Sequence, residues 1–330
     1  METRAAALSI DRELNVGVID VEGLHKTFSV RTKTGVIRRT RKLVHAVSDI
    51  DLRVDAGEMV GYIGPNGAGK STTIKMLTGI LAPSSGRVRV LGLEPVGRRV
   101  ELARRIGVVF GQRTQLWWDL PLEASFELLR RVYRVDRRRH SDKLDMFVEM
   151  LDLGAFLTTP VRQLSLGQRM RGELTAAFLH DPEIVFLDEP TIGLDVVSKH
   201  AVRSFLSETA GSATVILTTH DLADIEHLCR RMVIVDHGRI VYDGDLDTFR
   251  ARHGRRRTVI VDLEQEGPHL DVALAEVVKI EGARQWLQFD RAQTTAAEVV
   301  ARVVEQRAIR DISVEEPAIE ELVRNLYKPT

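Results

Sequence analysis

The chain of 330 residues carries Lys+Arg 47 and Asp+Glu 47, so its formal net charge is zero, and 44% of its residues are hydrophobic. This composition is typical of a globular protein with a buried core. The charge balance argues against nucleic acid as a partner, because proteins that bind DNA or RNA usually carry a basic excess. The single cysteine, Cys229, excludes an internal disulfide framework and a multi-cysteine metal site. No apolar run approaches the roughly 18 residues that a membrane-spanning helix needs.

The N-terminal part of the chain shows strand patterns. Residues 1–15 have the character of a loose leader, and residues 16–28 have strand character. Residues 31–42 hold six basic residues in twelve, and we expect them to form a loop or a hairpin tip. The segment 46–54, AVSDIDLRV, alternates apolar and polar residues, which predicts an antiparallel strand.

A glycine-rich segment, GPNGAGKS at 64–71, satisfies the pattern G-x-x-x-x-G-K-[ST]. It follows a predicted buried strand and precedes a helical pattern, which is the context that a phosphate-binding loop requires. The glycines let backbone N–H groups wrap a polyphosphate. Lys70 brings a positive charge to the β- and γ-phosphates, and the Ser71 hydroxyl ligates Mg²⁺. The predicted phosphate site comprises Gly64, Pro65, Asn66, Gly67, Ala68, Gly69, Lys70, Ser71 and Thr72.

The middle of the chain changes from helical to strand patterns. Residues 121–180 place apolar residues at spacings of three and four, which predicts helices. Short continuous apolar runs follow and predict buried parallel strands that alternate with helices. These runs lie at 183–190, 213–220 and 231–238. We therefore expect an α/β domain with an inserted helical lobe at about 113–180.

Polar residues stand where these predicted strands end. Asp188 and Glu189 are neighbours in the chain and face opposite ways. Asp188 therefore suits Mg²⁺ binding, and Glu189 is free to orient and deprotonate a water molecule. Gln112 follows the strand IGVVF and is either a Mg²⁺ ligand or a residue without a role in the site. His220 ends the run 213–220, where it either bonds the γ-phosphate or is structural.

From about residue 252 the pattern changes again. Strand patterns at 255–264 and 309–317 alternate with helical patterns at 294–308 and 318–327. We interpret this region as a small α+β appendage. Three roles remain as alternatives for it: a ligand sensor, a dimer clamp or a plain dimerisation element.

Several short motifs occur together in the order and at the spacing of ABC-type ATPase domains. They are GPNGAGKS, Gln112, LSLGQ at 164–168, LDEP at 187–190, GLD at 193–195 and His220. The chain resembles these domains over about residues 16–251. The resemblance implies an α/β fold of the P-loop NTPase class with an antiparallel β subdomain and an inserted helical subdomain. The small C-terminal α+β domain then covers 252–330.

The resemblance also implies ATP and Mg²⁺ as cofactors, and it implies roles for single residues. Phe28 stacks on adenine, Glu189 is the catalytic base and His220 senses the γ-phosphate. The residues that serve Mg²⁺ are Ser71, Gln112 and Asp188.

In this family two ATPase domains pack head to tail, and the helix that begins at LSxGQ faces the ATP held by the other domain. Helix N-termini attract phosphate, so this use is physically sensible. Ser165, Gly167 and Gln168 are the residues expected to touch the phosphate, and Asp195 is expected at the dimer seam. The chain carries one set of motifs and is expected to pair with a copy or with a related subunit, as a homodimer or a heterodimer. Leu166 departs from the family pattern, which most often has glycine there.

The stretch FGQRTQLWWDLPLEASFELL is similar to prokaryotic exporters of the ABC type-2 class, which include drug efflux systems. The resemblance implies an ATPase subunit that powers export of small molecules through separate membrane-spanning permease subunits, at the cytoplasmic face of the cell membrane. Trp117 and Trp118 either dock that permease or fill the core of the helical lobe. An importer subunit is an alternative. A soluble ABC ATPase acting on ribosomes or DNA is another, and it is disfavoured because such proteins generally carry paired cassettes, coiled-coil arms or zinc-binding cysteines.

Overall fold

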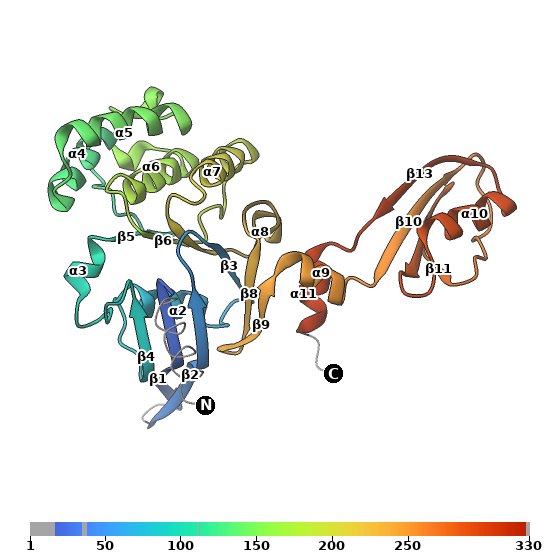
Figure 1. Ribbon diagram of the computed structural model, residues 1–330, viewed down its shortest axis with the longest axis horizontal. Helices are drawn as coiled ribbons and strands as arrows, with labels where there is room; N and C mark the ends of the chain where they lie inside the picture. The colour runs from blue at the N-terminus through green and yellow to red at the C-terminus, as the bar shows by residue number, and fades with distance from the viewer. Residues whose placement is uncertain (1–16, 35–37, 112, 328–330) are drawn as a thin grey trace, which may run out of the picture. The chain divides into compact units, whose positions relative to one another are not determined.

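The computed structural model describes residues 17–34, 38–111 and 113–327. The chain forms two compact units that divide between Asp243 and Gly244, and Figure 1 labels the elements of each. The expected leader, residues 1–15, lies outside the described residues. Among the described residues, no helix has both the length and the apolar character that a membrane crossing requires.

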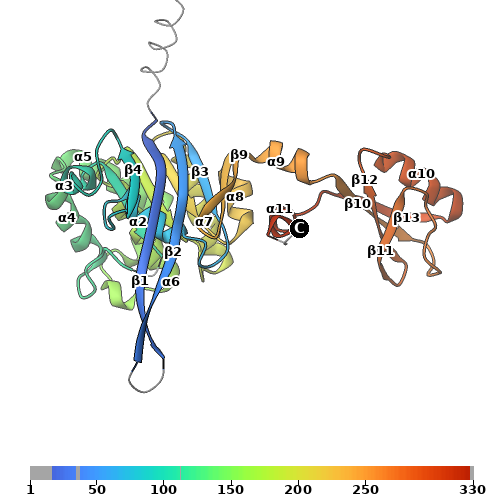
Figure 2. The same ribbon diagram turned by 90° about the horizontal axis from the view of Figure 1, so that it is seen from below.

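An antiparallel sheet in the first unit contains β1 (Ile19–Thr34), β2 (Arg38–Val54) and β4 (Ser85–Val90), in the order β2-β1-β4. β1 and β2 form a long hairpin (Figure 2). Of the two alternatives for residues 31–42, a loop or a hairpin tip, the pairing supports the hairpin: Arg31–Thr34 pair with Arg38–Arg41 at the end of the hairpin. Threonine recurs at positions 32, 34 and 40 and favours strands. The high density of basic residues, by contrast, is typical of a loop.

The central sheet of this unit has the strand order β5-β6-β7-β3-β8-β9, and pairing from β5 through β8 is parallel. The runs predicted as buried parallel strands are β6, β7 and β8. The strands are β3 (Met59–Ile63), β5 (Ile106–Phe110), β6 (Ile184–Asp188), β7 (Thr214–Thr218), β8 (Arg231–Asp236) and β9 (Arg239–Asp245). In parallel sheets the carboxyl ends of the strands lie at one edge, and ligands bind in the crevice there.

Helices α4, α5 and α6 group together at one side of the first unit (Figure 1). Phe126 of α4 and Phe147 of α5 are fully buried, in agreement with the predicted helical lobe. Short 3₁₀ turns interrupt the lobe after α5. The helices of this unit are α2 (Lys70–Leu77), α3 (Arg99–Ala103), α4 (Leu122–Tyr133), α5 (Arg137–Met150), α6 (Leu166–Phe178), α7 (Val196–Glu208) and α8 (Leu222–Leu228).

A single apolar core joins the antiparallel sheet to the central sheet. Ile19 of β1, Ile74 of α2 and Phe186 of β6 are completely buried members of this core. Helix α2 therefore has apolar contacts that hold it, and the glycine-rich loop before it, between the two sheets.

The second unit contains an antiparallel sheet of order β11-β12-β10-β13. Val299 and Val303 of α10 pack on Val259, Val261 and Leu287 of this sheet. The elements of the unit are α9 (Leu246–His253), β10 (Arg256–Leu263), β11 (Ala275–Glu281), β12 (Arg284–Asp290), α10 (Ala296–Gln306), β13 (Ile309–Glu315) and α11 (Ile319–Leu326). The boundary expected near residue 252 falls within α9.

Candidate active site

The glycine-rich loop links the end of β3 to the start of α2. Gly69 is the residue before α2 and has φ +104°, a conformation that favours glycine. A Cβ at this position would lie 2.4 Å from the carbonyl oxygen of Ala46, and a Cβ at Gly64 would lie 2.2 Å from that of Val235. The loop therefore needs glycine at both positions to close against its neighbours.

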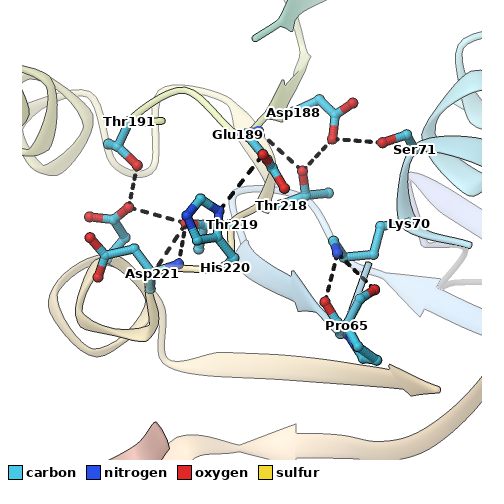
Figure 3. A network of polar contacts seen from close by, with 12 residues as sticks. Pro65, Lys70, Ser71, Asp188, Glu189, Thr191, Thr218, Thr219, His220 and Asp221 are labelled. Carbon is cyan, nitrogen blue, oxygen red and sulfur yellow. Dashed lines mark hydrogen bonds and ion pairs between the residues drawn. The ribbon is translucent and has the colours of Figure 1, made fainter. Parts of the chain in front are cut away.

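Lys70 is 6% exposed, and its side chain turns back into the loop. Its Nζ donates hydrogen bonds to the carbonyl oxygens of Gly64 at 2.6 Å and Pro65 at 3.2 Å (Figure 3). Burial lowers the pKa of Lys70, while the carboxylates of Glu189 and Asp188 act in the opposite direction. A cation is thus held inside the loop and faces two acids.

Asp188 at the end of β6 meets the first turn of α2. Ser71 Oγ donates to Asp188 Oδ1 at 3.2 Å, and Thr218 Oγ1 donates to the same oxygen at 2.5 Å (Figure 3). A hydroxyl and a carboxylate on neighbouring elements are the oxygen ligands that Mg²⁺ takes in nucleotide sites. The residues present therefore fit a Mg²⁺ ion bound together with a polyphosphate.

Glu189 has φ +56°, which is uncommon for a residue other than glycine and costs roughly 1–3 kcal/mol. Hydrogen bonds hold this backbone: its N–H donates to the Thr218 carbonyl at 2.9 Å and to Thr218 Oγ1 at 3.2 Å. The carboxylate lies 3.7 Å from Nδ1 of His220, measured from Oε2 (Figure 3). The strained backbone thus directs Glu189 away from Asp188 and toward His220.

A cavity of about 570 Å³ opens beside these groups. Gly111 and Arg113 line it on both sides of Gln112, which lies outside the described residues. Within the described part of the chain, residues 164–168 contribute nothing to its lining. The lining residues are Asn66, Ser71, Lys75, Ile80, Phe110, Gly111, Arg113, Asp188, Glu189 and Ile192.

The residues of the LSLGQ segment form the start of α6. Ser165 is the N-cap, and its side chain and that of Gln168 each bond the other's backbone N–H as a capping box. A Cβ on Gly167 would lie 2.2 Å from Oγ of Ser198, which in turn donates to Asp195 Oδ2 at 2.8 Å. Asp195 caps α7, and these hydrogen bonds lower its pKa. The structure therefore brings the predicted dimer residues of α6 and α7 together.

Phe28 lies on β1, half-buried, with its ring 5.2 Å from Nζ of Lys26, and it is not among the lining residues of the cavity. Trp117 and Trp118 are 40% and 48% exposed. The alternative that these tryptophans fill the core of the helical lobe is therefore wrong.

Two residues that the sequence did not single out organise the site. Thr218 bonds Asp188 through its hydroxyl and Glu189 through both its hydroxyl and its carbonyl. Asp224 is completely buried and accepts from Thr191 Oγ1 at 2.5 Å and Thr219 Oγ1 at 3.2 Å. The position of Thr218 next to the polar end of β7 was the available signal. The sequence carries no signal for Asp224, because an aspartate within the helical segment of α8 is not unusual.

This α/β fold, with a glycine-rich loop between β3 and α2, defines a P-loop NTPase. Residues 47–192 match the family model described as ABC transporter. The daunorubicin resistance ATP-binding protein DrrA3 of Streptomyces coeruleorubidus is 34% identical over 289 residues, which span 85% of this chain and 90% of that protein. The ABC transporter ATP-binding protein NatA of Bacillus subtilis is 31% identical over 210 residues, which span 63% of this chain and 85% of that protein.

A solved ATP-binding subunit of an ABC transporter superposes with a TM-score of 0.61 at 29% identity, covering 72% of this chain and 93% of that one. An ATP-binding cassette solved as a dimer with ADP and Pi shares the fold, with a TM-score of 0.60 at 24% identity, covering 69% of this chain and 98% of that one. The chain belongs to the ATP-binding proteins of ABC transporters, a family of ATP-hydrolysing subunits.

Proposed function

We propose that this chain binds MgATP in the cavity at the end of β3 and hydrolyses it with Glu189 as the catalytic base. Hydrolysis drives export of small molecules through separate membrane-spanning subunits. The observation that carries the proposal is the placement of Glu189. Glu189 lines the same cavity as Ser71 and Asp188, and its backbone is held in a strained conformation.

Each polar group of the site has a task in this reaction. The N–H groups of residues 66–71 and the Lys70 ammonium bind the phosphates. Ser71 and Asp188 hold the Mg²⁺ ion, which when bound neutralises developing charge on the phosphate oxygens. Glu189 orients the attacking water and takes its proton. His220, beside Glu189, donates a hydrogen bond to the terminal phosphate.

A second subunit completes the site. Ser165, Gly167 and Gln168 begin a helix whose N–H groups and dipole favour phosphate, yet they do not line this chain's own cavity in the part of the chain that the structure describes. We assign them to the ATP of a partner ATPase subunit, identical or related, with Asp195 at the seam. Gln112 would serve the metal from between Gly111 and Arg113, and Phe28 would contact adenine from β1.

The membrane-spanning subunits would dock near Trp117 and Trp118, placing the chain at the cytoplasmic face of the cell membrane. Exposed aromatic side chains are enriched in protein interfaces. Export is favoured over import because two relatives that align with most of the chain are a daunorubicin resistance ATP-binding protein and a Nod factor export ATP-binding protein. The relative from Rhizobium sp. (strain N33) is 36% identical over 237 residues, which span 71% of this chain and 73% of that protein.

Affinity purification of the tagged chain from its native membranes, after gentle solubilisation, tests this proposal. We expect polytopic membrane proteins to be recovered with the chain. Replacing both Trp117 and Trp118 by alanine should remove them while ATP binding persists. Val304→Ala changes an exposed apolar residue of the C-terminal unit and should retain them. Recovery of ribosomal or DNA-associated proteins without membrane proteins would overturn the proposal.

A further inference from the structure

One buried acid on the helix that begins with the LSLGQ segment contacts the loop that follows β5. Glu173 of α6 is 4% exposed. The hydroxyl of Thr114 donates to Glu173 Oε1, and the N–H of Gln115 donates to Glu173 Oε2 at 3.3 Å. A buried carboxylate with such partners holds them strongly, because leaving them unpaired is costly.

A further hydrogen bond makes the same connection: the Gln115 side chain donates from Nε2 to the Glu173 carbonyl at 3.3 Å. Within the loop, the Leu116 N–H donates to Thr114 Oγ1 at 3.1 Å and holds the hydroxyl that contacts Glu173. Leu116 is 4% exposed, and a Cβ at Gly172 would lie 3.3 Å from its Cδ1. The loop 114–116 is therefore fastened to α6 by its backbone, by its side chains and by apolar contact.

The same loop is also connected to the metal side of the cavity. Gly111 N–H donates to the Asp188 carbonyl at 2.8 Å, and Arg113 N–H donates to the Phe110 carbonyl at 2.9 Å. Gly111 thus contacts Asp188, and Thr114 and Gln115 contact Glu173, within five positions of the chain. Glu173 follows the N-cap Ser165 by eight positions, which corresponds to about 12 Å along α6.

We propose that Glu173 is a positioning residue that makes α6 move together with the loop 113–116, so that nucleotide bound beside Asp188 sets the position of Ser165. The inference rests on the proposed function, because it concerns how the same site reaches its partner. Glu173 touches neither nucleotide nor metal. Its effect is to present the α6 N-terminus to the ATP of the partner subunit.

Hydrogen exchange of the full chain, with and without a non-hydrolysable ATP analogue and Mg²⁺, tests the inference without relying on activity. In the parental chain we expect the analogue to slow exchange both at the phosphate loop, 64–71, and at the first turns of α6, 165–171. In Glu173→Ala the protection at 64–71 should remain, and the change at 165–171 should be lost.

A matched control separates positioning from loss of stability. Thr175 is also fully buried on α6, but its hydroxyl donates to the Arg171 carbonyl at 2.9 Å within the helix. Thr175→Val should lower stability while leaving both responses in place. Glu173→Gln retains the acceptor oxygen for Gln115 and should restore most of the response that Glu173→Ala loses.

The rate of ATP turnover is a second measurement of the same effect. Glu173→Ala should lower kcat by about tenfold, the scale of a lost hydrogen bond to a charged group, with the Kd for MgATP changed less than about twofold. Thr114→Val removes a partner from the other side, so the double variant should be no slower than the slower single variant. Retained protection at 165–171 in Glu173→Ala would overturn the inference. Absence of protection at 64–71 in the parental chain would overturn the proposed function and the inference with it.

Discussion

Replacing Asp224 by alanine should destabilise the first unit more than the loss of a surface ion pair would. The side chain of Asp224 is completely buried, and Arg203 donates to its Oδ1 from Nε at 2.6 Å and from Nη2 at 2.5 Å. The hydroxyls of Thr191 and Thr219 donate to Oδ2. Alanine would remove the main acceptor of Arg203, which would keep only its 3.7 Å contact with Asp221, and the acceptor that the hydroxyls of Thr191 and Thr219 share.

The magnitude follows from the burial of these groups. Removing one partner of a buried ion pair costs roughly 3–5 kcal/mol. Because the Arg203 side chain is 24% exposed and still contacts Asp221, we expect the low end of this range, about 3 kcal/mol. Asp224→Asn keeps the shape of the side chain and one of its two acceptor oxygens, so we expect a smaller loss of about 1–2 kcal/mol. Combining Asp224→Ala with Arg203→Met should recover part of the loss, because the cation that lost its main partner is removed as well.

Urea unfolding followed by tryptophan emission measures these differences. The chain has three tryptophans, of which Trp117 and Trp118 lie in the first unit and Trp286 in the second. In a Trp286→Phe background the emission reports on the first unit alone. A loss below about 1 kcal/mol for Asp224→Ala, the range of a surface pair, would refute the reasoning.

Three further outcomes are expected. Glu189→Gln should slow hydrolysis by about 10²–10⁴-fold, the usual contribution of a general base, and keep MgATP bound; unchanged hydrolysis would remove Glu189 from this role. Ser165→Arg should abolish hydrolysis and leave ATP binding to the isolated subunit intact, whereas lost binding would indicate that Ser165 acts on its own cavity. Burial lowers the pKa of His180 to about 4 from 6.5, so the unfolded chain binds more protons and the stability of the first unit should fall between pH 6.5 and 4 by up to about 3 kcal/mol. Urea titration at each pH checks this, and His180→Phe, which keeps a ring on Tyr133, should flatten the dependence.

Local patterns predicted the parts of the site that follow strands. The apolar run before Asp188 is a central parallel strand, buried along its length, so its position and the position of its last residue follow from hydrophobicity alone. The glycine-rich loop was equally predictable from its motif. The structure explains the motif, because a Cβ at Gly64 or Gly69 would clash with a backbone carbonyl oxygen. The roles assigned to these residues remain predictions.

Contacts between distant segments could not be predicted in this way. Thr114 and Glu173 are 59 positions apart, and Thr191 and Asp224 are 33 positions apart. None of these four residues breaks a helical or strand pattern, so nothing in the sequence marks them. Only the packing of α6 on the loop after β5, and of α8 beside the end of β6, brings them together.

Weak patterning explains the missed strands of the second unit. In β11 most side chains are exposed, and Val278 and Ile280 are 50% and 45% exposed, so the apolar residues follow no clear alternation. In β12 charged and amide side chains alternate with Leu287 and Phe289, but the run is short. β12 pairs with β10 and β11 pairs with β12, so tertiary pairing decides both strands.

The leucine of the LSLGQ segment has a consequence for the construction of hybrid subunits. Leu166 is 37% exposed, and any Cβ placed at Gly193 would lie 3.1 Å from its Cδ2. Gly193 also has φ +69°, and Gly167 sits against Ser198. The residue types at 166–167 and at 193–198 are therefore matched to one another. A chimera that takes one of these segments from a relative should take the other from the same donor, or the two helix starts will no longer share one surface.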